Sequence, residues 1–139
     1  MIDLSISGNY HCPYWVNYPI GIHGAIGGLL EGEPIICGGF NNAYTSKNCY
    51  EITSKRSDQL VIMSTMRSNA AGVVINGSTF WITGGKDHNA NALLSSEFIQ
   101  WNGTMPGPKL PNPLVGHTMV IINNDLTMVI GGGITGLTK

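Results

Sequence analysis

Acidic side chains and histidines are the groups of this 139-residue chain that could serve as catalytic acids, bases or metal ligands. Glu31 and Glu33 form a close pair of acids, but they fall in an expected hairpin turn, where carboxylates are ordinarily solvated. The histidines lie far apart in the sequence, at His11, His23, His88 and His117. No two of them have the spacing of metal ligands on one strand. The sequence therefore predicts no catalytic residue, no metal site and no cofactor.

The cysteines offer a second kind of chemistry. They are Cys12, Cys37 and Cys49, an odd number whose spacing matches no zinc or redox motif. Each could be a buried free thiol. Alternatively, Cys37 and Cys49 could form a disulfide, which requires that the segments containing them pair as strands. Such a bond would persist only in an oxidising compartment, and Cys12 would then remain unpaired.

The composition excludes several classes of protein. Charged residues make up 11% of the chain and the net charge is −1, so binding to nucleic acid or to an anionic membrane is not expected. The ample apolar content argues against disorder. No apolar run approaches 18 residues, so no membrane span is expected. The first ten residues lack the basic start and apolar middle of a secretory signal, which indicates an intracellular chain or an incomplete gene product.

Three internal repeats organise the chain. Each has an apolar run, a short polar turn, a second apolar run and a glycine pair, within 24–39, 71–85 and 117–133. The pairs recur about 46 residues apart and are Gly38-Gly39, Gly84-Gly85 and Gly131-Gly132. Neither a phosphate-loop spacing nor a following helix accompanies them, so they are interpreted as structural.

Each repeat is predicted to form four short strands. Asn76-Gly77 between β-branched runs is a strong hairpin signal, which predicts strands over 71–75 and 79–83. A third strand is expected over 95–100. The fourth is expected near 104–106, and near 60–63 in the preceding repeat. No stretch has a helical period, and four prolines between Pro106 and Pro113 oppose a helix there.

These residues resemble the kelch repeat. The similarity rests on Met66-Arg67-Ser68, the glycine pairs, Leu94–Phe98, and Leu110-Pro111 leading to Gly116-His117. The resemblance covers essentially residues 1–139 and implies an all-β fold, a segment of a kelch-type β-propeller with four-stranded antiparallel blades. One departure is the tryptophan usual on the fourth strand: it is missing near Leu60, and Trp101 stands in a turn instead.

The blades can be counted on this basis. Residues 1–18 would end one blade, 24–63 and 70–106 would form two whole blades, and 116–133 would begin another. That is about three blade equivalents, whereas propellers close with four to eight. Two apolar blade faces would be left uncovered. The chain is therefore expected to belong to a longer propeller or to self-associate.

Topology predicts a binding face. In an antiparallel blade, the loops between the second and third strands emerge on the same side as the loops that lead into the next blade. The resemblance implies that this side binds partners, as the same side does in kelch propellers. The reachable candidates are Tyr44, Arg67, Lys86, Asp87 and His88. The expected function is non-catalytic binding of a protein or glycan. The alternative is a fragment of a propeller enzyme, of the oxidase or sugar-acid isomerase type, whose catalytic residues lie outside this chain.

Two glycosylation sequons begin at Asn76 and Asn102, both on the side opposite the predicted binding face. Cys37 would end a second strand and Cys49 would begin the third strand paired with it, so the two could lie side by side. Closing so short a loop would stabilise the fold by about 3 kcal/mol. Disulfide and glycans together favour an extracellular over a cytoplasmic location.

Overall fold

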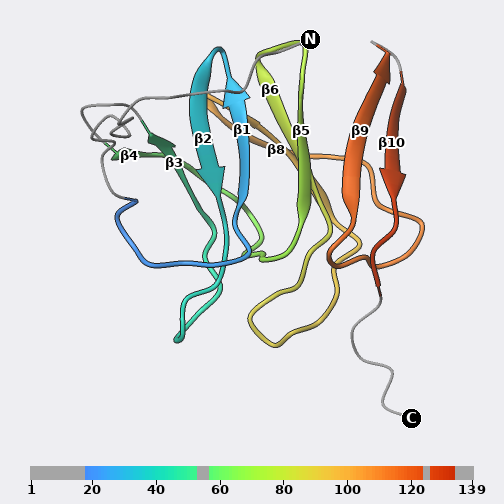
Figure 1. Cartoon of the computed structure of the whole chain (residues 1–139), viewed down its shortest axis with the longest axis horizontal. Coiled ribbons are helices and arrows are strands. Elements are labelled where there is room, and N and C mark those ends of the chain that lie inside the picture. Colours follow the sequence, from blue (N-terminus) through green and yellow to red (C-terminus); the bar gives the residue numbers. More distant parts are fainter. Residues whose placement is uncertain (1–17, 53–56, 124–125, 134–139) are drawn as a thin grey trace, which may run out of the picture.

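The chain consists of antiparallel β-strands in a computed structural model that describes residues 18–52, 57–123 and 126–133 (Figure 1). Sheet I, in the order of the chain, contains β1 (Ile26–Leu30), β2 (Glu33–Cys37), β3 (Asn48–Ile52) and β4 (Ser57–Ile62). Sheet II repeats this order with β5 (Ala71–Ile75), β6 (Thr79–Thr83), β7 (Ser96–Gln100) and β8 (Gly103–Pro106). A hairpin of β9 (Thr118–Asn123) and β10 (Leu126–Ile130) follows. The prediction of an all-β chain with four-stranded antiparallel sheets is confirmed.

The strands of sheet II follow the sequence pattern closely. β5 and β6 have the predicted bounds, and the turn between them places Asn76 at φ 52° and Gly77 at φ 69°, the left-handed conformations that a tight hairpin needs. β4 differs from the expectation of 60–63. The register between β3 and β4 shifts next to Cys49, and this irregularity lets β4 pair along the whole of β3. Residues 1–17, which include His11, Cys12 and nearly all of the expected first segment, lie outside the described residues.

The three units stand side by side, with β1, β5 and β9 next to one another (Figure 1). The core lies between sheets I and II. Phe80 is fully buried there because Gly28 on β1 and Gly72 on β5 leave room for its ring. A Cβ on Gly72 would come within 2.7 Å of that ring. Both faces of β5 are covered, by sheet I and by β9, which explains its nearly continuous apolar run. The buried residues of this core are Ile26, Leu30, Ile35, Cys37, Cys49, Val61, Met63, Phe80, Ile82 and Ile99.

The glycine pairs join each unit to the connection that enters the next one. All six pair glycines have positive φ, between 57° and 94°. The backbone N–H of Gly39 donates to the carbonyl of Arg67 at 2.9 Å, and that of Gly85 donates to the carbonyl of Leu114 at 2.8 Å. A Cβ on Gly84 would lie 2.6 Å from the same Leu114 oxygen. Both the conformation and the close approach of another backbone therefore require glycine.

Cys37 and Cys49 are bonded as a disulfide within sheet I. They face each other across β2 and β3, and both are fully buried in the core. In sheet II the same cross-strand position holds Thr83 and Ser96, so the disulfide belongs to one repeat and is absent from the next.

Candidate functional site

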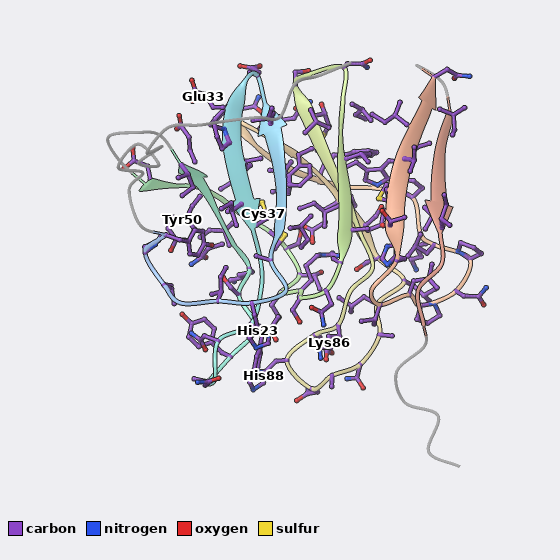
Figure 2. All side chains as sticks on the ribbon, in the orientation of Figure 1. His23, Glu33, Cys37, Tyr50, Lys86 and His88 are labelled. Atoms are coloured by element: carbon purple, nitrogen blue, oxygen red, sulfur yellow. A yellow bond between two sulfur atoms is a disulfide. The ribbon has the colours of Figure 1, made fainter. Side chains whose placement is uncertain are left out.

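The loops between β2 and β3 (38–47) and between β6 and β7 (84–95) emerge at one end of the sheets, together with the connections 63–70 and 107–117. We call this end the loop face. In Figure 2, His23, Lys86 and His88 gather there, whereas Glu33 lies at the opposite end. The two loops border a shared hollow of about 130 Å³. Its lining residues are Phe40, Thr45, Lys86, Asp87, His88 and Ala90.

Side chains of the loops themselves fix their shape. The carboxamide oxygen of Asn41 accepts hydrogen bonds from the backbone N–H groups of Ala43 and Tyr44, at 2.9 and 2.8 Å. In the next loop, Asp87 accepts from the backbone N–H groups of Asn89 and Asn91, at 2.8 and 2.9 Å. These are turns of the kind that Asn and Asp favour, because the short side chain replaces a backbone acceptor. The loop face is thus built from ordered turns.

Backbone bridges tie each loop to the segment that precedes its sheet. His23 and Phe40 exchange two hydrogen bonds, and their rings meet edge to face with centroids 5.4 Å apart. Ser68 and Lys86 exchange the equivalent pair, at 3.0 and 2.9 Å. Phe40 and Lys86 therefore occupy the same position of the repeat, two residues after the first glycine of each pair. Sequence reasoning missed Phe40, although it shares its repeat position with Lys86, and it missed His23, which corresponds to Ser68.

Four of the five predicted binding residues reach this surface. Tyr44 and His88 are exposed, while Lys86 and Asp87 are half-buried around the hollow. Asp87 is largely occupied by its own loop. Burial would raise the pKa of its carboxyl, but the hydrogen bonds from Asn91 and Asn89, with the charge of His88, outweigh burial and lower this pKa. Asp87 therefore shapes the loop, and the remaining three are the groups open to a partner.

The prediction that Arg67 is reachable is wrong, because its side chain is 0% exposed. Its guanidinium crosses from the connection 63–70 into sheet II. There it donates to the carbonyls of Gly84 at 2.8 Å and Ser95 at 3.1 Å, and pairs with the carboxylate of Glu97 at 2.8 Å. Spacing alone could not reveal this, since an arginine in a loop is usually solvated.

Glu97 completes this buried network. Its carboxylate also accepts hydrogen bonds from the backbone N–H groups of Ser64 and Thr65, at 2.7 and 3.0 Å, and from the Ser64 hydroxyl at 2.9 Å. Burial would raise the pKa of Glu97, but the hydrogen bonds from Arg67 and Ser64 and the arginine charge outweigh burial and lower it. The pair therefore joins the connection 63–70 to sheet II as charged groups, and it is structural.

The side chain of His117 is also buried. Its Nε2 lies 2.8 Å from the Thr83 hydroxyl, and its Nδ1 is buried without a hydrogen-bond partner. Burial lowers the pKa of this imidazole, and the hydrogen bond to Thr83 opposes that shift less strongly. At neutral pH His117 is therefore an uncharged group between sheet II and the β9–β10 hairpin.

The other predicted positions lie away from the loop face. Glu31 and Glu33 are exposed around the turn after β1, and Asn76 and Asn102 are exposed in the turns after β5 and β7.

Within the described parts of the chain, no three side chains of His, Cys, Asp or Glu gather into a group able to hold a metal ion. No helix of the described residues is long and apolar enough to cross a membrane.

Comparison with known proteins adds no family to this description. The chain matches no protein-family model and no curated protein sequence.

Proposed function

We propose that this chain is part of a kelch-type β-propeller and that it binds a partner protein, without catalysis, through the loop face. The observation that carries the proposal is the adjacency of two repeat-equivalent loops. They present Phe40, Lys86 and His88 around one hollow, and the exposed Tyr44 belongs to the first of these loops. Neighbouring loops on a repeated scaffold are a common way to build a binding surface.

The size of the hollow favours a protein over a small molecule. A pocket for a cofactor or a drug-sized ligand usually has a volume of about 300–1,000 Å³. The hollow on the loop face has about 130 Å³, which suits a single side chain of a partner. The aromatic ring of Phe40 beside it is of a residue type that is enriched in protein interfaces. A partner would therefore anchor one side chain here and contact the surrounding loops.

The propeller part of the proposal is supported by what the glycine pairs contact. Gly38 and Gly84 each lie against a carbonyl of the next connection, from Arg67 and Leu114 respectively. Gly131 has the same positive φ, 71°, yet an added Cβ would meet nothing within 4 Å among the described residues. This difference supports the proposal that a further connection of the same kind approaches Gly131.

Two apolar faces also need a cover. On one face of the β9–β10 hairpin, Val120, Ile122 and Ile130 are exposed. At the other side of the molecule, an apolar hollow of about 510 Å³ lies between the segment preceding β1 and the strand β2. Its lining residues are Tyr18, Ile20, Gly21, Ile22, Ala25 and Ile36. Further blades of the same type are the occupants that we propose for both faces.

Selection of peptides from a random displayed library against the whole chain tests the binding function. We expect Tyr44→Ala, Lys86→Ala and His88→Ala each to weaken the selected peptides at least several-fold, as truncation of interface anchors does. Glu33→Ala is the matched control at the opposite end and should leave their affinity unchanged. Peptides that bind the three loop-face variants as tightly as the parent chain would contradict the proposal.

A further inference from the structure

A second, larger hollow lies at the end of the sheets opposite the loop face. It has a volume of about 660 Å³ and spans the boundary between sheets I and II. The backbone N–H of Glu31 donates to the carbonyl of Gly77 at 2.6 Å, which holds the β1–β2 turn against the β5–β6 turn. Sheet I supplies two lining residues and sheet II four: Glu31, Glu51, Ser78, Gln100, Trp101 and Asn102.

Trp101 forms a fixed aromatic wall of this hollow. Its side chain is half-buried and packs against the hydrophobic core, so the ring is held in place from behind. The same residue lines the open hollow. Trp101 is the tryptophan whose place in a turn departs from the kelch pattern, and the proposed loop-face function gives it no role. An indole held in this way is the best side-chain surface for stacking a cation.

Among the residues that the structure describes, the charge around the hollow is negative. Glu31 and Glu51 make no ion pair with any other described residue, and none of the six lining residues is a cation. The amide of Gln100 is oriented by its donation to the Thr79 hydroxyl at 2.8 Å, which leaves the Gln100 carbonyl oxygen as an acceptor. The described lysines Lys47, Lys86 and Lys109 all belong to loop-face connections. Within the described residues, the hollow thus combines an aromatic surface with acceptors that are paired with no described cation.

We propose that this hollow binds an arginine side chain together with the adjacent backbone of the extended peptide segment that carries it, since its volume exceeds what one side chain fills. The planar guanidinium stacks on the indole of Trp101, and its N–H groups donate to the carboxylates of Glu31 and Glu51 and to the Gln100 carbonyl. A guanidinium fits better than an ammonium because it is flat, stacks on aromatic rings and donates in two directions. This site is distinct from the loop face and does not depend on the function proposed there.

The test uses a peptide that carries a single arginine, acetyl-Gly-Gly-Arg-Gly-Gly-amide, and its citrulline counterpart, which has the same shape without the charge. The whole chain is produced in bacteria, so that no glycan occupies Asn102. Binding is followed by the NMR signals of the indole N–H groups, of which the Trp101 signal is identified by its loss in Trp101→Phe. The arginine peptide should shift the Trp101 signal in a saturable manner, and the citrulline peptide should bind at least tenfold more weakly.

Variants separate this site from its surroundings. Glu31→Gln combined with Glu51→Gln should weaken the arginine peptide at least tenfold, whereas Glu33→Gln, on the same strand pair but outside the hollow, should leave it unchanged. Lys86→Ala should also have no effect, because Lys86 lies on the loop face. The proposal is overturned if the arginine peptide leaves the Trp101 signal unmoved, if citrulline binds equally well, or if the double glutamine variant binds as tightly as the parent chain.

Discussion

Replacement of Glu97 by glutamine should lower the free energy of unfolding by about 3–5 kcal/mol. Glutamine has nearly the same shape but no charge, so the guanidinium of Arg67, which is 0% exposed, would remain buried without its counter-ion. The Ser64 and Thr65 N–H groups would lose a charged acceptor as well. Urea unfolding at pH 7 and a fixed protein concentration measures the change, and Glu33→Gln on the surface should stay within about 0.5 kcal/mol of the parent chain.

The same pair predicts a loss of stability in acid. The folded state lowers the pKa of Glu97, so its stabilising contribution is complete above the ordinary glutamate pKa and disappears as the pH falls through the lower folded value. In Glu97→Gln this part of the pH dependence should be missing. A double-mutant cycle with Arg67→Met should show that the two changes together cost less than the sum of the single changes. Additive costs, or an unaltered acid profile, would mean that the two groups do not act as a pair.

Replacement of the disulfide is the second change with a large expected effect. The variant Cys37→Thr with Cys49→Ser installs the residue types that sheet II has at its equivalent positions, Thr83 and Ser96. It should unfold with a free energy about 3 kcal/mol lower than that of the oxidised chain, because the closed loop no longer restricts the unfolded state. Chemical denaturation of the two proteins without reductant measures this difference.

Reduction offers a control on the same bond. Both sulfur atoms are fully buried, so thiol reagents should reduce the folded chain slowly and should react fast only after denaturation. The reduced chain should then have about the stability of the double variant. Free thiols at Cys37 and Cys49 in folded protein from its native source, or equal stability of oxidised and reduced protein, would contradict a structural role for the bond.

The strands could be predicted because their signals are local. Asn76-Gly77 fixes a tight turn, and the apolar runs on either side then have defined lengths. Because the glycine pairs recur at a constant spacing, the same strand prediction could be applied to all three units. The start of β4 could not be predicted, because it depends on a register shift against β3 that no local pattern in the sequence marks.

The site was less accessible to sequence reasoning, because burial across two sheets is not a local property. Arg67 has the sequence context of a solvated loop residue, yet the packing of the sheets places its side chain beside Glu97. Glu97 itself carried a usable signal: a carboxylate between the strand residues Ser96 and Phe98 needs a partner when the strand is covered on both faces. The hollow at Trp101 joins residues of both sheets, so it becomes visible only after these sheets are packed together.

Light scattering on the purified chain, coupled to size-exclusion chromatography, tests the central claim most directly. If β9–β10 and the outer side of sheet I are propeller faces that further blades cover, the chain alone should not persist as a soluble monomer. We predict a soluble, closed assembly of several copies, with and without reductant. A folded, soluble monomer that remains stable with both apolar faces uncovered would contradict the propeller account.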